Sequence, residues 1–125
     1  MTASWSAEQL DLVSRSCELH ISSRRSDGSF RPSVPIWVVS FDDEVYVRTW
    51  YRRTTGWFGR VIDLPQAHIR VPGLEADVII TDVGGGAPGI RARVDDAYRA
   101  KYGASGHQSM VTDDAAATTL RLDPK

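Results

Sequence analysis

Residues 34–50, VPIWVVSFDDEVYVRTW, decide the fold class of this protein. The run 34–41 is β-branched and aromatic on both faces, which is typical of a strand that is covered on both sides. Asp42 and Asp43 favour a turn, and 45–50 is again rich in strand-forming residues. The stretch therefore predicts two neighbouring antiparallel strands, the first of them central in its sheet.

A helix is predicted on the N-terminal side of these strands. Ser6 can accept a hydrogen bond at a helix start, and Gln9, three residues later, can reach back to the backbone N–H of Ser6. Trp5 and Leu10 stand where a hydrophobic staple packs across such a start. Together these residues predict a helix that begins close to Ser6.

Further short elements surround this central stretch. Asp27 and Gly28 are a strong signal for a hairpin turn. The alternating segments give about six strands, most of them joined by tight turns, and this pattern favours a barrel or a sandwich. We expect one domain over residues 1–125, mainly β with flanking helices. The remaining predicted strands cover 19–23, 67–71, 76–83 and 118–122, and the remaining helices cover 57–64 and 94–102.

The composition restricts the classes of function. The chain has 125 residues and a net charge of −1, so nothing draws it generally to nucleic acid or to acidic membranes. No apolar run approaches the roughly 20 residues of a membrane span, and no secretory signal is recognisable. Cys17 is the only cysteine and cannot form an internal disulfide. We therefore expect a cytoplasmic protein that binds neither nucleic acid nor membrane.

Two patterns that suggest known sites are discounted. The loop 84–89 formally contains G-x-G-x-x-G, but Pro88 stands where a phosphate-binding helix would begin and no second βαβ unit follows. His20, His68 and His107 lack metal-ligand spacing, so no metal site is predicted. No nucleophile motif is present either, and the catalytic residues stay unknown at this point.

The stretch 48–58, RTWYRRTTGWF, is the most informative for function. It holds three arginines, three threonines and four aromatic residues. Arginine forks, hydroxyl groups and the N–H groups of a helix start are what a phosphate needs, and aromatic planes can stack on a flat ring. The alternative is a solvated basic turn with tryptophans in the core. RNA binding is a weaker option because the overall charge is close to neutral.

A second basic cluster covers 23–37, SRRSDGSFRPSVPIW. It is a hairpin that leads into a strand with two prolines. Because proline cannot donate to a strand ladder, the pattern suggests an edge strand or an irregular backbone that could face a ligand. The alternative is an ordinary edge strand beside a solvated turn.

The two clusters together resemble the split β-barrel superfamily of flavin- and deazaflavin-binding proteins. This superfamily includes pyridoxamine-phosphate-oxidase-like proteins and deazaflavin-dependent nitroreductases. The resemblance lies in the order of a helix, a strand, SRRSDGSFRPSVPIWVV at 23–39, DDEVYVRTW at 42–50 and GWF at 56–58. It implies a split β-barrel of antiparallel strands.

Two later motifs resemble an uncharacterised bacterial family within that superfamily. They are DDAYRAKYG at 95–103 and ATTLRLDP at 117–124. The resemblance extends over about residues 5–124.

This resemblance implies a homodimer with two cofactor sites at its interface, where FMN or the deazaflavin F420 exchanges hydride with a small-molecule substrate. Basic, hydroxyl and aromatic residues after the third strand and at the helix start would hold the cofactor phosphate. These residues are Arg48, Thr49, Arg52, Arg53 and Trp57. The strand after the first hairpin would lie along the ring system. Its residues are Ser33, Val34, Pro35 and Ile36.

Two alternatives use the same cleft without a redox cofactor. One is a small-molecule isomerase, cyclase or dehydratase, and the other is a non-catalytic ligand-binding protein. A split barrel is compatible with each of them, because a fold by itself does not define a function.

Overall fold

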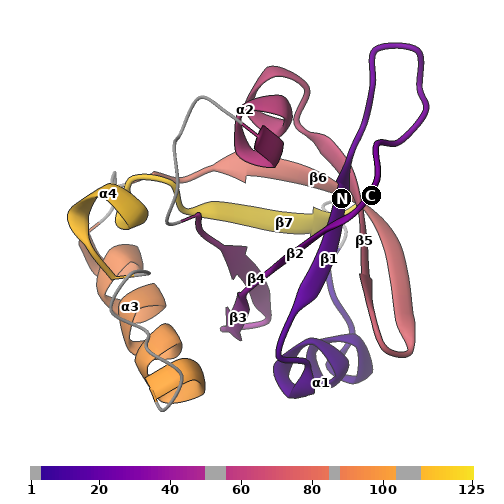
Figure 1. The fold of residues 1–125 in the computed structure, drawn as a ribbon. Coiled ribbons are helices and arrows are strands. Elements are labelled where there is room, and N and C mark those ends of the chain that lie inside the picture. The colour runs from indigo at the N-terminus through magenta and orange to yellow at the C-terminus, as the bar shows by residue number, and fades with distance from the viewer. Residues whose placement is uncertain (1–3, 50–55, 85–87, 104–110) are drawn as a thin grey trace.

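The computed structural model describes residues 4–49, 56–84, 88–103 and 111–125. Its centre is one antiparallel sheet of seven strands in the order β2-β1-β5-β6-β7-β4-β3. The sheet curls into a nearly closed barrel with helices around it (Figure 1), which confirms the expected split β-barrel. The strands are β1 Leu19–Ser23, β2 Val34–Ile36, β3 Val38–Phe41, β4 Glu44–Val47, β5 Gln66–Val71, β6 Leu74–Asp82 and β7 Leu120–Pro124, and the helices are α1 Ala7–Arg15, α2 Gly56–Asp63, α3 Pro88–Tyr102 and α4 Asp113–Ala116.

The prediction of one central strand over 34–41 was wrong. The run divides at Trp37 into β2, which pairs with β1, and β3, which pairs with β4. These two short strands are the opposite edges of the sheet. The division also explains why the sheet has seven strands rather than about six.

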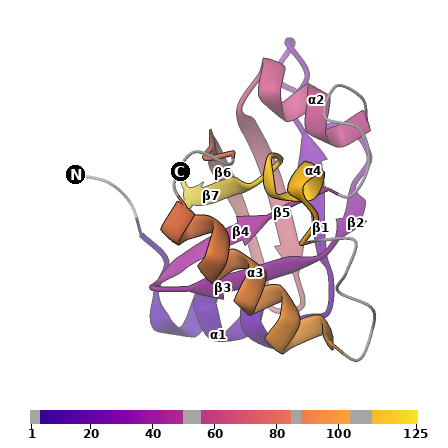
Figure 2. The same ribbon diagram turned by 90° about the vertical axis from the view of Figure 1, so that its left-hand side faces the viewer.

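Burial on both faces, in contrast, is confirmed for β3, and β4 is buried on both faces as well. Val38, Val45 and Val47 belong to the core inside the barrel. Val39 and Tyr46 belong to a second apolar cluster, which they form with residues of α3. Figure 2 shows α3 lying across β3 and β4, so these strands have the barrel interior on one face and a helix on the other.

The predicted N-terminal helix is confirmed as α1. The Ser6 hydroxyl accepts a hydrogen bond from the Gln9 backbone N–H at 3.1 Å, and the Gln9 side chain accepts from the Ser6 N–H at 2.8 Å. Trp5 lies in the barrel core and its indole N–H donates to the Leu122 carbonyl at 2.8 Å. The start of α1 is thereby attached to the last strand.

The helix predicted at 94–102 is longer than expected and begins at Pro88. Proline is well suited to the first turn of a helix, because its missing N–H has no helical partner there. The strands on either side of this helix, β6 and β7, are antiparallel. The segment is therefore not the crossover of a βαβ unit, in agreement with the rejection of the dinucleotide motif. The prediction of a loop over 84–89 was wrong at Pro88 and Gly89, which belong to α3.

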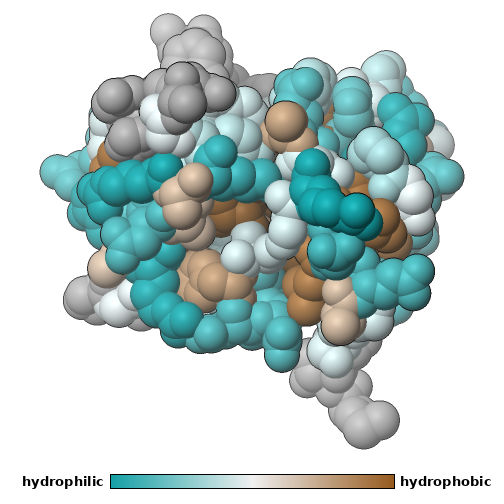
Figure 3. All heavy atoms as spheres, turned by 90° about the horizontal axis from the view of Figure 1, so that it is seen from below, coloured by the Kyte–Doolittle hydropathy of each residue, from teal (hydrophilic) through white to brown (hydrophobic). Residues whose placement is uncertain are grey.

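The outer surface is mainly polar on the side that Figure 3 presents, where hydrophobic patches lie between hydrophilic residues. Within the described ranges, no helix is long and apolar enough to cross a bilayer.

Two side chains of α3 attach this helix to the barrel. The Lys101 ammonium donates to the carbonyls of Val38 at 2.8 Å and Val13 at 3.2 Å. The Tyr102 hydroxyl accepts from the Val38 N–H at 3.1 Å and donates to the Cys17 carbonyl at 2.6 Å. Burial lowers the pKa of Lys101 to about 8.

This lowered pKa predicts how stability depends on pH. Between pH 8 and 10.5 the unfolded chain holds the Lys101 proton more tightly than the folded chain does. The free energy of unfolding should therefore rise with pH across this window for the parent, relative to Lys101→Met. Urea denaturation of both proteins in steps from pH 8 upward measures the difference. If the difference in the free energy of unfolding between the two proteins stayed constant with pH, the lowered pKa of Lys101 would be contradicted.

Candidate functional site

The residues expected to lie along a ring system occupy an edge of the sheet. Among the strands that the structure describes, β2 pairs only with β1. Ser33 and Pro35 are exposed and Val34 is 36% exposed, whereas Ile36 is buried in the core. The suggestion of an edge strand is thus confirmed, and three of the four residues are accessible from solvent.

Arg48 lies just beyond the end of β4 and is completely buried. Its guanidinium donates to the Asp95 carboxylate on α3 at 2.5 Å and to the Thr119 hydroxyl at 2.8 Å. It also lies over the Tyr98 ring, 5.8 Å from the centroid. Arg48 is therefore engaged inside the protein and fastens the end of β4 to α3 and to the start of β7.

Thr49 continues this attachment. Its backbone N–H donates to the Thr118 hydroxyl at 3.0 Å, and that hydroxyl lies 3.1 Å from the Thr49 carbonyl. Thr49 is buried as well. Arg52 and Arg53, the other two predicted phosphate ligands, lie outside the described residues, so the predicted phosphate site is described only at its two ends.

Trp57 marks the other end of this predicted phosphate site. It is half-buried at the start of α2 and contacts Phe58 edge-on, with 5.7 Å between ring centroids. Phe58 and Val61 are buried in the barrel core and hold α2 in place. The helix α2 packs against β1, the strand that pairs with β2.

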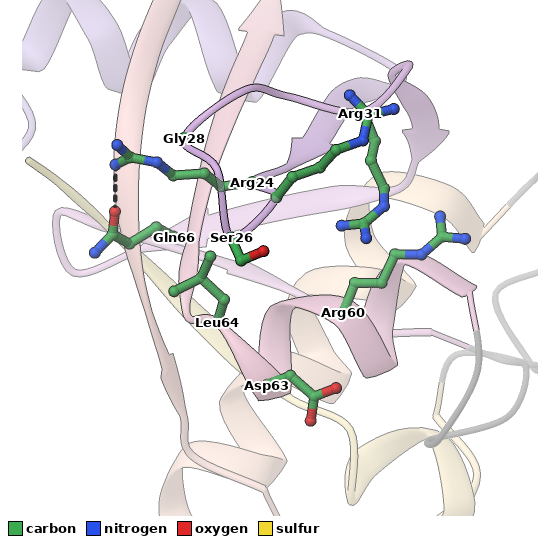
Figure 4. A pocket seen from close by; sticks show the side chains of 9 residues that line it. Arg24, Ser26, Gly28, Arg31, Arg60, Asp63, Leu64 and Gln66 are labelled. Carbon is green, nitrogen blue, oxygen red and sulfur yellow. Dashed lines mark hydrogen bonds between the residues drawn. The ribbon is translucent and has the colours of Figure 1, made fainter.

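A pocket of about 650 Å³ opens between the β1–β2 hairpin and the C-terminal end of α2. We call it the arginine pocket because four arginines line it, three from the hairpin and one from α2 (Figure 4). One aspartate, one leucine, one serine, one glycine and one glutamine complete the lining. The lining residues are Arg24, Arg25, Ser26, Gly28, Arg31, Arg60, Asp63, Leu64 and Gln66.

The hairpin that carries three of these arginines is held in one shape. Gly28 has a φ of +93°, and the Asp27 carboxylate accepts from the backbone N–H of Ser29 at 2.9 Å. These features confirm the predicted Asp27-Gly28 turn. The hydrogen bonds from Ser29 also lower the pKa of Asp27, because they stabilise its charged form.

Two of the four arginines are oriented by neutral acceptors. The Arg24 guanidinium donates to the Gln66 side-chain oxygen at 2.6 Å, which links the hairpin to β5 (Figure 4). The Arg25 guanidinium donates to the Phe30 carbonyl at 3.1 Å. Neither acceptor carries a charge. The one carboxylate of the hairpin, that of Asp27, is close enough to Arg25 for the two charges to attract one another, and this attraction contributes to the lowered pKa of Asp27.

The pocket therefore has a strongly positive potential. Within the described part of the chain, none of its four arginines forms an ion pair with a carboxylate. Among the described residues of the lining, Asp63 is the only acidic one. Guanidinium groups in this number are suited to oxyanions such as phosphate and carboxylate, which they bind in a bidentate manner.

Sequence reasoning found only part of this pocket. The hairpin arginines lie in the basic cluster 23–37, but Arg60 and Gln66 were not selected. The predicted helix 57–64 places Arg60 and Asp63 on one face, since they are three residues apart. Nothing in the sequence indicates that this face meets the hairpin.

The comparisons with known proteins agree on the family and the fold. The profile of a bacterial family described as an uncharacterized protein conserved in bacteria (DUF2255) matches residues 9–122. Among curated proteins, none is similar enough to be matched.

Several solved structures have the same fold at low sequence identity. A conserved hypothetical protein from Mycobacterium tuberculosis is 15% identical with a TM-score of 0.65, over 97% of this chain and 79% of the other. A FAD-binding protein from Mesorhizobium loti is 12% identical with a TM-score of 0.63, over 100% and 94%. A putative pyridoxamine 5'-phosphate oxidase from Lactobacillus delbrueckii is 12% identical with a TM-score of 0.58, over 100% and 97%.

Other neighbours have different described roles. One is an F420 reductase that is 13% identical with a TM-score of 0.53, over 92% of this chain and 91% of the other. Another is a heme storage protein from Vibrio cholerae that is 13% identical with a TM-score of 0.63, over 94% and 88%. At such identities the likeness establishes the fold, the split barrel of pyridoxamine-phosphate-oxidase-like proteins, and leaves function to the site.

The buried ion pair of Arg48 and Asp95 should contribute strongly to stability. Asp95→Asn would remove the carboxylate that pairs with the buried Arg48, and breaking a buried ion pair costs about 3–5 kcal/mol of unfolding free energy. Chemical denaturation of the variant and its parent measures this loss. The matched control is Asp96→Asn, whose carboxylate is 77% exposed in its pair with Arg99 and should contribute less than about 1 kcal/mol. An equal loss of unfolding free energy in Asp95→Asn and Asp96→Asn would contradict the assignment of Arg48 and Asp95 as a buried, stabilising ion pair.

Proposed function

Because the chain belongs to the bacterial family DUF2255 and has the split-barrel fold, we propose that it is a flavin- or deazaflavin-dependent oxidoreductase acting on a small organic molecule. The resemblance of its sequence motifs to that superfamily supports the proposal. Split-barrel neighbours described as a FAD-binding protein and as an F420 reductase support it further.

The single observation that carries the proposal is the open edge of β2. Among the described strands β2 pairs with β1 alone, and its exposed Val34 and Pro35 offer apolar surface to a flat ring, one on each face of the strand. The unpaired backbone groups of an edge strand can also bond to the polar rim of a heterocyclic ring. A flavin or deazaflavin ring requires both features, so the residues present fit the group.

We assign the binding roles as follows. Ser33, Val34 and Pro35 would contact the ring, and the buried Ile36 would hold the strand in place. Arg52 and Arg53 would bind the cofactor phosphate, and their role stays a prediction. The remaining residues would frame the phosphate site without direct charge contact. They are Arg48, Thr49 and Trp57.

The chemistry would come from the cofactor, which supplies hydride transfer when it is bound. The contribution of the chain is to bind, orient and shield it. Arg48 and its partner Asp95 keep the end of β4 in position and so determine where the phosphate-binding segment starts. Phe58 on α2 is packed in the core and fixes the other end of that segment.

We also propose a homodimer in the cytoplasm. The open edge strand β2 with its exposed Val34, together with the exposed Phe30 of the preceding hairpin, is a surface that a second copy of the chain could cover. Ring sites placed at such an interface would be closed off from water by the partner. The single Cys17 is consistent with a reducing compartment.

Titration of the purified protein with FMN and with F420 tests the proposed function. We expect micromolar binding of one of them, seen by calorimetry and by a change in cofactor fluorescence. Binding of neither cofactor by the folded protein would overturn the redox proposal. The cofactor-free isomerase, cyclase or dehydratase and the non-catalytic binding protein would then be the remaining candidates.

A double variant tests the assigned phosphate ligands. Arg52→Ala with Arg53→Ala should weaken cofactor binding by roughly 2–4 kcal/mol, because two charge-assisted hydrogen bonds are lost. The matched control is Arg70→Ala, an exposed arginine on β5 outside the cluster, which should leave the affinity unchanged. The same cofactor affinity in all three proteins would show that Arg52 and Arg53 do not bind the cofactor phosphate.

A further inference from the structure

We propose that the arginine pocket is a binding site for a small molecule that carries clustered oxyanion groups, either two linked phosphates or several neighbouring carboxylates. The inference rests on the pocket itself and is independent of the proposed redox function. It concerns residues of the β1–β2 hairpin and of the end of α2 that are separate from the predicted phosphate ligands.

The first argument is the uncompensated charge. Four arginines converge on one concavity whose lining includes a single carboxylate, that of Asp63. Like charges held close together repel one another and destabilise the fold locally. A bound polyanion would remove this repulsion, and a single phosphate would leave much of it in place.

The second argument is that two of the arginine side chains are preorganised. Arg24 and Arg25 are held by Gln66 and by the Phe30 carbonyl, so part of the entropy cost of ordering them has already been met. The side chains of Arg31 and Arg60 have no hydrogen bond or ion pair to any residue that the structure describes, whereas their backbone groups are bonded. Figure 4 shows Arg31 reaching from the hairpin toward Arg60 on α2, so these two side chains can close on a ligand from both sides.

The third argument is size and shape. A volume of about 650 Å³ lies within the usual range of small-molecule sites, roughly 300–1,000 Å³. The positive charge is gathered in one concavity, while the whole chain has a net charge of −1. Nucleic acid is usually bound by an extended basic surface, so a compact polyanion is the better fit.

The position of the pocket leaves two sources for the anionic groups. Arg31 precedes the exposed Ser33 by two residues, so the pocket adjoins the proposed ring site at the start of β2. The ligand is therefore either an anionic part of the cofactor or a separate anionic substrate. The chemistry of recognition is the same for both.

Calorimetric titration with inorganic pyrophosphate tests the site, with inorganic phosphate as the comparison. We expect pyrophosphate to bind more tightly than phosphate, with an affinity that falls as salt is added. Arg31→Gln combined with Arg60→Gln should weaken pyrophosphate binding about tenfold or more. The matched control Arg70→Gln should not change it.

Either of two results would overturn the proposal that the arginine pocket binds clustered oxyanions. One is the absence of pyrophosphate binding, and the other is binding that the double variant leaves unchanged. Tighter binding of a single-stranded oligonucleotide than of pyrophosphate, lost in the double variant, would likewise replace the small-molecule assignment. If the double variant does not fold, Arg60→Gln alone serves, because Arg60 is exposed on the helix surface.

Repeating the titration with saturating cofactor distinguishes the two sources. Competition would place an anionic part of the cofactor in the pocket, and simultaneous binding would identify a separate anionic substrate. A protein that binds pyrophosphate but neither FMN nor F420 would refute the redox function and still support the anion site. Failure of one proposal is therefore distinguishable from failure of the other.

Discussion

The closure of the sheet at Trp37 is the constraint on which the rest of the structure depends. Only this residue separates β2 from β3, although the two strands form opposite edges of the sheet. The sheet must therefore curl until its edges meet. The Trp37 ring stacks on Tyr102 of α3 at 4.2 Å between centroids, so the corner is held from outside the barrel. The curl encloses the core and leaves the other side of β2 open for recognition.

Charged arginines are used in two opposite ways in this barrel. Arg48 is completely buried and forms an ion pair with Asp95, and this pair holds the end of β4 to α3. In the arginine pocket, four guanidinium groups stay accessible and lack carboxylate partners among the described residues. A nearly neutral chain can therefore present a strongly positive site, because local potential depends on how charges are distributed rather than on their sum.

The sequence alone was sufficient for features that depend on neighbours along the chain. The capping box of Ser6 and Gln9 predicted the start of α1, and Asp27-Gly28 predicted the hairpin turn. Both act within a few residues, so their geometry follows from residue type and spacing. Strand alternation was sufficient for a barrel or a sandwich, since period-two burial is visible in the sequence. The split-barrel class came from the resemblance of the motif order to a known superfamily.

Tertiary structure alone decided which elements meet. A run that is β-branched and aromatic on both faces is compatible with a central strand and equally with two edge strands. The division of 34–41 at Trp37 into the exposed β2 and the helix-covered β3 was therefore not predictable. The sequence predicted Arg48 as a ligand of a cofactor phosphate, but its ion pair with Asp95, 47 residues away, was not predictable. The pocket joins Arg24 to Gln66 across 42 residues for the same reason. Local patterns determine elements, but contacts between distant residues arise only when the barrel closes.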